Sequence, residues 1–270
     1  MEPTLNITDS TGMPFWTTAF ASQQTDEKVG LRVYGKAERA VPLPVMLYFH
    51  GGLFNCGSVD DAAGLARRLA TEAVIVCVDY PLAPKLHFPA TVELAFEALL
   101  WTAAHAPELG ADATRIIVAG DQAGGNLAAV VAMMARDRGL RVDHAKLRGQ
   151  VLISPMLDPQ QATRSMQKAD DCPCRKAWSD YLPCASDAMH PYAAPATSRR
   201  LGGLAPALIV SAELDPLRDE AEQYAAKLIA AGVPVQMRRI EGAQGKLAQP
   251  EHPGFDQVVQ VVSQFVADAA

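Results

Sequence analysis

Short apolar runs alternate with longer amphipathic stretches along most of the chain. Six of the runs are rich in Val and Ile and lack polar alternation, which is typical of strands buried on both faces. These runs are Val45–Phe49, Val74–Val78, Ile116–Ala119, Val151–Ile153, Ala207–Val210 and Val235–Ile240. Because strands alternating with helices build parallel sheets, the pattern predicts an α/β fold: a mostly parallel central sheet with helices on both faces.

Helices are predicted where apolar residues recur at helical spacing. One apolar stripe follows Val92, Phe96, Leu99 and Ala103, and another follows Val258, Val261, Val262 and Phe265. A third helix is expected over Leu217–Ala231, because Gly232 directly after it is a natural helix terminus.

Residues 156–204 break this alternation. The segment is rich in Pro, Ser, Asp and Cys and has no clear period. Irregular segments of this length are usually functional or mobile, and in α/β sheets ligands bind beyond the carboxyl ends of the strands. We therefore expect one domain over residues 1–270, with a reduced cap or lid over residues 156–204.

Composition narrows the classes of function. The chain has 24 Lys and Arg against 30 Asp and Glu, a net charge of −6, which is not the basic balance of a nucleic-acid-binding module. No apolar run approaches the roughly 18 residues of a membrane span, and the first residues do not have the pattern of a secretory signal. The odd count of five cysteines suits a reducing compartment. We expect a cytoplasmic protein without a cofactor, a nucleic-acid partner or a membrane partner.

Two loops carry the candidate chemistry. In the first, His50, Gly51 and Gly52 directly follow a strand, and the glycines leave N–H groups free to point at an anion or a carbonyl oxygen. In the second, Gly120-Asp121-Gln122-Ala123-Gly124 lies between a strand and an apolar helix, as in a nucleophile elbow. We expect the N–H groups of Gly51, Gly52 and Ala123 to form an oxyanion-type pocket beside Gln122.

These motifs, in this order, resemble the hormone-sensitive-lipase-like branch of the α/β-hydrolase fold, the carboxylesterases with an HGGG motif. The resemblance runs from about Val45 to the C-terminus, and Leu53 stands at the third glycine of that motif. It rests on His50-Gly51-Gly52, Asp79-Tyr80-Pro81-Leu82-Ala83-Pro84, Phe88-Pro89-Ala90, Gly110-Ala111-Asp112, Gly120–Asn126 and Asp215-Pro216-Leu217-Arg218-Asp219-Glu220.

The chain departs from the family at two of the three triad positions. The resemblance implies a serine nucleophile where Gln122 stands and a histidine base where Gly245 stands, while Asp215 matches the family acid. A carboxamide cannot form an acyl-enzyme, and Asp215 has no imidazole to orient. In subtilisin, removing the serine or the histidine alone lowers turnover by about 10⁶. We therefore expect a degenerate triad without serine-hydrolase activity.

The surroundings of Asp215 leave alternatives open. Three environments are compatible with the sequence: an ion pair with Lys246, a hydrogen bond from the Gln122 amide, or a carboxylate without a catalytic role whose oxygens accept backbone N–H groups. His252, seven residues past the expected base position, is interpreted as a loop histidine rather than a displaced base, and His50 as a structural residue of the oxyanion loop.

The cysteines offer weaker candidates. Cys56 follows the oxyanion loop and is interpreted as a small buried core residue. Cys172, Cys174 and Cys184 with His190 could be drawn as a zinc site, but their spacing matches no standard pattern. We interpret them as free thiols and expect no metal.

Three functions fit these residues. The first is a pseudoenzyme that binds a small acyl or carbonyl compound in the former active-site pocket; the plant gibberellin receptors, which resemble these esterases and lack the histidine, are its precedent. The second is a non-hydrolytic catalyst (a cyclase, lyase or decarboxylase) that uses the oxyanion donors. A third is a slow hydrolase with an atypical mechanism. The resemblance also implies a possible homodimer through the last strand or helix.

Overall fold

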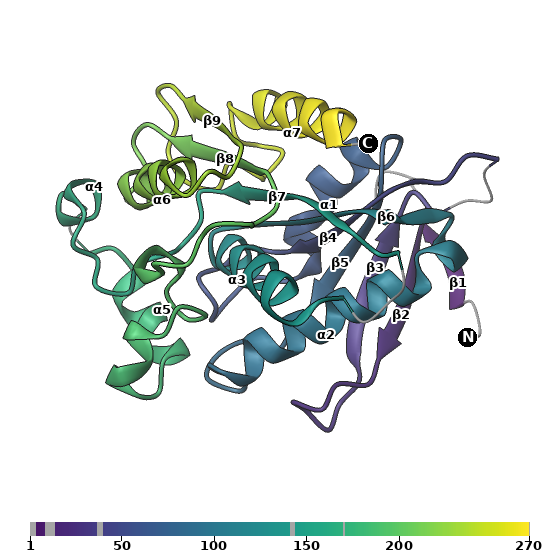
Figure 1. Ribbon diagram of the computed structural model, residues 1–270, viewed down its shortest axis with the longest axis horizontal. Coiled ribbons are helices and arrows are strands. Elements are labelled where there is room, and N and C mark those ends of the chain that lie inside the picture. The colour runs from purple at the N-terminus through teal and green to yellow at the C-terminus, as the bar shows by residue number, and fades with distance from the viewer. Residues whose placement is uncertain (1–3, 9–13, 37–39, 141–143, 170, 270) are drawn as a thin grey trace.

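Six parallel strands form the core of a single sheet in the computed structural model, which describes residues 4–8, 14–36, 40–140, 144–169 and 171–269. Their order across the sheet is β5-β4-β6-β7-β8-β9 (Figure 1). They span Leu43–Phe49 (β4), Val74–Asp79 (β5), Ala111–Asp121 (β6), Leu147–Ile153 (β7), Ala207–Ala212 (β8) and Val235–Ile240 (β9). Each predicted strand lies within one of them, so the predicted fold class is confirmed.

Three antiparallel strands, which the sequence analysis did not predict, extend the sheet beyond β5. They are Thr4–Thr8 (β1), Pro14–Phe20 (β2) and Val29–Tyr34 (β3), and β3 pairs antiparallel with β5. The sequence of residues 1–20 shows no strong amphipathic period, and part of this segment lies outside the described residues. In β3, burial alternates as expected for a strand, since Val29, Leu31 and Val33 are buried while Gly30 and Arg32 are partly exposed.

Helices cover both faces of the sheet. On one face lie Ala90–His105 (α2), Ala123–Arg138 (α3) and Arg218–Ala230 (α6), whose buried residues join one apolar cluster. On the other face, Val59–Leu69 (α1) and Phe255–Ala269 (α7) pack together in a second cluster. The predicted stripes on α2 and α7 face the core, and α6 ends just before Gly232, whose φ is +79°. No helix in the described part of the chain is long and apolar enough to cross a membrane.

Residues 156–204 form short helices beyond the carboxyl ends of the parallel strands (Figure 1). They contain Arg164–Gln167 (α4) and Cys174–Tyr181 (α5), together with 3₁₀ turns at Ala185–Met189 and Pro195–Thr197; a further 3₁₀ turn, Pro107–Leu109, precedes β6. The segment contacts the loop after β4, since Asn55 Nδ2 donates to Asp180 Oδ2 at 2.8 Å. The segment predicted to be a cap thus lies at the end of the sheet where we expected the site.

Candidate active site

Gln122 stands at the tip of a sharp strand-to-helix turn. It links the end of β6 to the first residue of α3, Ala123, with φ +49° and ψ −113°. This is a backbone conformation that residues with a side chain rarely adopt. The main chain of Gln122 is held on both sides, because its N–H donates to Ile153 O at 3.0 Å and its carbonyl accepts the N–H of Met156 at 3.0 Å. The geometry is that of a nucleophile elbow with a glutamine side chain at its tip.

Glycines at the elbow allow the backbone of β4 to approach α3. A Cβ on Gly124 would lie 2.0 Å from Phe49 O and 2.5 Å from His50 O, and one on Gly120 would lie 2.3 Å from the backbone of Gly124. Real Cβ atoms do not come this close to other heavy atoms. The two glycines therefore bring the oxyanion loop next to the elbow.

The Gln122 carboxamide lies against the oxyanion loop, the segment His50–Gly52. The N–H of Gly52 donates to Gln122 Oε1 at 3.1 Å, and a Cβ on Gly51 would lie 3.1 Å from the same oxygen. The side-chain oxygen of Gln122 therefore lies where the carbonyl oxygen of a ligand would accept a hydrogen bond from the Gly52 N–H. The N–H of Ala123, in the first turn of α3, has no carbonyl partner within the helix. Gly51, Gly52 and Ala123 thus lie beside Gln122, and among the described hydrogen bonds it is the Gly52 N–H that donates to its side chain.

The neighbouring carboxylate of Asp121 engages the other glycine. Tyr48 Oη donates to Asp121 Oδ1 at 2.8 Å, and a Cβ on Gly51 would lie 2.2 Å from Oδ2. Burial raises the pKa of Asp121 to about 6, against the lowering effects of the Tyr48 hydroxyl and the Gly51 N–H and with a further increase from Asp61. The Gly51 N–H therefore faces a carboxylate of the protein itself, and Gly52 is the glycine that faces the side chain at the elbow.

Asp215 is buried beyond the end of β8, with only 4% of its surface exposed. Its Oδ1 accepts the backbone N–H of Leu217 at 2.9 Å, whereas its Oδ2 has no hydrogen-bond partner among the described residues. Burial raises the pKa of Asp215, and the Leu217 N–H and the nearby Ser154 hydroxyl offset part of that rise. The Ser154 hydroxyl does not complete a hydrogen bond of ordinary geometry. Of the alternatives open at the sequence level, the backbone-capped carboxylate is the one observed.

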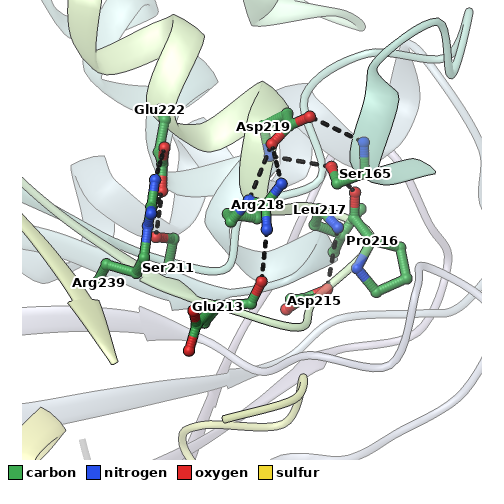
Figure 2. A network of polar contacts seen from close by, with 10 residues as sticks. All are labelled: Ser165, Ser211, Glu213, Asp215, Pro216, Leu217, Arg218, Asp219, Glu222 and Arg239. Carbon is green, nitrogen blue, oxygen red and sulfur yellow. Dashed lines mark hydrogen bonds and ion pairs between the residues drawn. The ribbon is translucent and has the colours of Figure 1, made fainter. Parts of the chain in front are cut away.

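A polar network fixes the loop that carries Asp215. Figure 2 shows one dashed line from Leu217 to a single oxygen of Asp215, and beside it the contacts of Arg218 and Asp219. Arg218 donates to the carbonyl of Glu213 at 2.6 Å and pairs with Asp219 at 2.7 Å, and Asp219 accepts the N–H of Ser165 at 2.8 Å. The network connects the Asp215 loop to α4 of the cap segment. The sequence analysis did not identify Ser165, which reaches this loop from about fifty residues away.

Gly245 faces Asp215. A Cβ on Gly245 would lie 3.3 Å from Asp215 Oδ2, 3.6 Å from Cγ and 3.7 Å from Oδ1. Gly245, which stands where the family has its histidine base, therefore faces the Asp215 Oδ2 atom that lacks a hydrogen-bond partner. Lys246 is exposed, and the described ion pairs and hydrogen bonds include none between Asp215 and either Lys246 or the Gln122 amide. Those two suggested pairings of Asp215 are wrong.

Two histidines near the loops are engaged elsewhere. His50 is buried, its Nδ1 lies 2.7 Å from Gly51 O, and its ring stacks on Tyr80 at 4.3 Å. Burial lowers the pKa of His50, which favours a neutral ring. His252 Nδ1 accepts the N–H of Gly254 at 2.9 Å within its own turn. Both contacts suit the structural interpretations given to these histidines.

Aromatic residues join the oxyanion loop to the cap segment. Phe54 stacks on Tyr181 of α5 with ring centroids 3.8 Å apart and an interplanar angle of 1°, and Trp178 packs beside both. The sequence analysis did not identify this cluster, because its members are about 125 residues apart in the chain. A cavity of about 810 Å³ is lined by residues of α4, α5 and the segment between them. Its lining includes Met166, Cys172, Arg175 and Asp180 but not the predicted site residues.

The cysteines differ in part from expectation. Cys56 is exposed, not buried as predicted, because a tight turn from Gly52 to Cys56 places it at the surface, where its Sγ donates to Gly52 O at 2.9 Å. Cys172, Cys174 and Cys184 are free thiols, but Cys174 is buried, and burial raises its pKa. The described residues hold no group of three or more His, Cys, Asp or Glu side chains arranged to bind a metal ion.

Comparisons with known proteins identify the family. Residues 46–246 match the family described as alpha/beta hydrolase fold. Most of the described chain also superimposes on a solved arylesterase with a TM-score of 0.85, covering 95% of this chain and 84% of that one at 29% identity. The chain belongs to the hormone-sensitive-lipase-like carboxylesterase family of the α/β-hydrolase fold.

Curated relatives include both hydrolases and a receptor. The chain is 38% identical over 224 residues to "Esterase LipI" of Mycobacterium tuberculosis, which covers 79% of this chain and 69% of that protein. It is 32% identical over 247 residues to "Gibberellin receptor GID1" of Oryza sativa subsp. japonica, which covers 85% of this chain and 68% of the receptor. The family therefore contains at least one relative named for binding rather than for hydrolysis.

Proposed function

We propose that this protein is a non-hydrolytic member of the esterase family that binds a small acyl or carbonyl compound in the former active-site pocket. The observation that carries the proposal is the hydrogen bond from the Gly52 N–H to Gln122 Oε1. It supports the loss of hydrolysis in two ways. The elbow presents a group that cannot attack an ester, and the oxyanion loop receives a carbonyl oxygen of the protein itself.

The acid and base positions support the same interpretation. Serine hydrolysis needs a base that takes the hydroxyl proton and an acid that orients the base. Asp215 is retained, but Gly245 presents no titratable group to it. The relative named as a gibberellin receptor supports binding as an outcome available to this fold. The expected partner is a small molecule; the homodimer and the cytoplasmic location remain predictions.

Release of p-nitrophenol from short acyl esters tests the loss of hydrolysis. We expect the wild-type protein and Gln122→Ala to release it at the uncatalysed rate. The double variant Gln122→Ser/Gly245→His is expected to exceed both, and Gln122→Ser alone is its control, because a serine without a base gains little. A clear wild-type rate that Gln122→Ala leaves unchanged would contradict the proposal, and His252→Ala would then be examined for an atypical mechanism.

Ligand binding is tested separately, by calorimetry with short-chain esters, amides and carboxylic acids. Gln122→Ala frees the Gly52 N–H, so a ligand with a carbonyl group should bind this variant more tightly than the wild type. One neutral hydrogen bond is worth about 0.5–1.5 kcal/mol, which corresponds to roughly a two- to tenfold change in Kd. Mass-spectral conversion of a bound compound without added water would favour the cyclase, lyase or decarboxylase alternative instead.

A further inference from the structure

The buried acid at the end of β8 has one oxygen that nothing in the described chain satisfies. Asp215 is 4% exposed, and its Oδ1 is bonded to the Leu217 N–H, whereas its Oδ2 has no partner. Buried carboxylate oxygens are nearly always hydrogen-bonded, because leaving one unbonded costs free energy. An unsatisfied oxygen of this kind therefore calls for a donor.

The unsatisfied oxygen points toward Gly245. A Cβ on Gly245 would come within 3.3 Å of Oδ2, and the three heavy atoms nearest to that Cβ all belong to Asp215. Gly245 itself is partly exposed, so this side of the carboxylate can be approached from solvent. On this side, the Asp215 carboxylate thus faces a residue without a side chain, and its Oδ2 is an acceptor without a donor.

No cation of the described chain supplies the missing contact. Arg218, three residues after Asp215, turns to Glu213 O and Asp219 instead (Figure 2). The ion pairs of the described residues do not include Asp215, and Lys246 is exposed and does not pair with it. The negative charge of Asp215 is therefore available to a group from outside the chain.

We infer that the side of the Asp215 carboxylate that faces Gly245 is a subsite for an N–H donor group of the ligand, such as an azole, an ammonium or a guanidinium. Such groups form charge-assisted hydrogen bonds with a carboxylate, which are stronger than neutral ones. The subsite deepens the proposed function and rests on it for one point only: that the same ligand also presents a carbonyl group.

The two parts of the proposed site follow two strands, β6 and β8, that are separated in the sheet by β7. Gln122 follows β6 and Asp215 follows β8, while Ser154 follows β7 between them: the Gln122 N–H donates to Ile153 O and the Ser154 N–H donates to Val210 O. The Ser154 hydroxyl is also near enough to Asp215 to lower its pKa. A single small molecule that carries a carbonyl oxygen and an N–H donor therefore fits this edge of the sheet better than a simple alkyl ester.

Chemical rescue with imidazole tests the subsite. In the variant Gln122→Ser, imidazole bound beside Asp215 would take the proton of the introduced hydroxyl as that oxygen attacks p-nitrophenyl acetate, and p-nitrophenolate would leave. General-base catalysis contributes roughly 10²–10⁴-fold, so an untethered base should raise the rate about 10- to 100-fold. The increase should saturate with imidazole concentration and disappear in Gln122→Ser/Asp215→Asn. The surface control Gln122→Ser/Asp256→Asn should keep it, because the Asp256 side chain is 81% exposed.

An imidazole effect that is linear in concentration and equal in the wild-type protein would be the reaction of imidazole in solution, and it would overturn the inference. Should Gln122→Ser not fold, imidazole is titrated into the wild-type protein and followed by NMR. Saturable binding that Asp215→Asn abolishes supports the subsite, and its absence overturns it. The NMR readout uses imidazole alone, so it is independent of whether an acyl ligand binds at Gly52, and it separates a failure of the subsite from a failure of the proposed function.

Discussion

Replacing Gln122 by glycine or by alanine separates two effects that act at the elbow. The residue has φ +49°, a conformation that costs a non-glycine residue on the order of 1–3 kcal/mol. Its side chain also accepts the hydrogen bond from Gly52, worth about 0.5–1.5 kcal/mol. Both variants lose this hydrogen bond, but only Gln122→Gly relieves the backbone strain.

The two variants should therefore differ in stability. Glycine lowers stability by about 0.5–1 kcal/mol through the greater freedom of the unfolded chain. Subtracting this from the strain relief leaves Gln122→Gly more stable than Gln122→Ala by about 1 kcal/mol. Gln122→Ala itself should be less stable than the wild type by about 1 kcal/mol, the value of the lost hydrogen bond.

Urea unfolding at neutral pH, followed by circular dichroism, measures all three free energies of unfolding. Equal m-values are required, so that the differences refer to the folded state. If Gln122→Ala is as stable as Gln122→Gly or more so, the elbow stores no backbone strain and the reasoning fails. If Gln122→Ala matches the wild type, the Gly52 hydrogen bond contributes nothing to stability.

Two further predictions concern the residues around the elbow. Burial raises the pKa of Asp121 from 3.8 to about 6, so the stability that its protonated form contributes at low pH is lost as the pH rises through about 4 to 6. The free energy of unfolding of the wild type, relative to that of Asp121→Asn, should therefore fall across this pH range. A difference between the two proteins that does not change with pH would contradict the assigned pKa. Gly124→Ala should destabilise the fold by about 3 kcal/mol or more, because its Cβ would lie 2.0 Å from Phe49 O. Gly202→Ala is its control, since that Cβ would meet Ala231 O at an ordinary 3.6 Å, and similar unfolding midpoints for the two variants would show that the close approach at Gly124 relaxes without cost.

The parallel half of the fold could be predicted because its strands are buried on both faces. Runs such as those of β4 and β8 are continuous in Val, Ile and Leu, and local pattern alone identifies them. The antiparallel strand β2 escaped prediction, because only Phe15 and Phe20 are buried and the residues between them are partly or fully exposed. Strand β3 and helix α1 did carry usable signals, namely the alternation from Val29 to Val33 and the capping box of Ser58 with Asp61.

The sequence was enough to locate the residues of the candidate site, but not to predict the hydrogen bonds that their side chains make. Counting along family motifs placed Gln122, Gly245 and Asp215, and the structure brings Gly245 against Asp215. The hydrogen bond from Gly52 to Gln122 could not be predicted, because it depends on a side-chain rotamer in a pocket formed by two distant loops. The exposure of Cys56 depends in the same way on the geometry of one turn.

The close approach of Gly120 and Gly124 to neighbouring backbone has a consequence for reading such sequences. Neither glycine contributes an atom to chemistry at the elbow, and a methyl group at either position would overlap main-chain atoms. Selection for folding alone is enough to preserve them, whether or not the protein turns over a substrate. The presence of these glycines therefore reports on chain packing, whereas the side chains at positions 122 and 245 are the ones that bear on the chemistry.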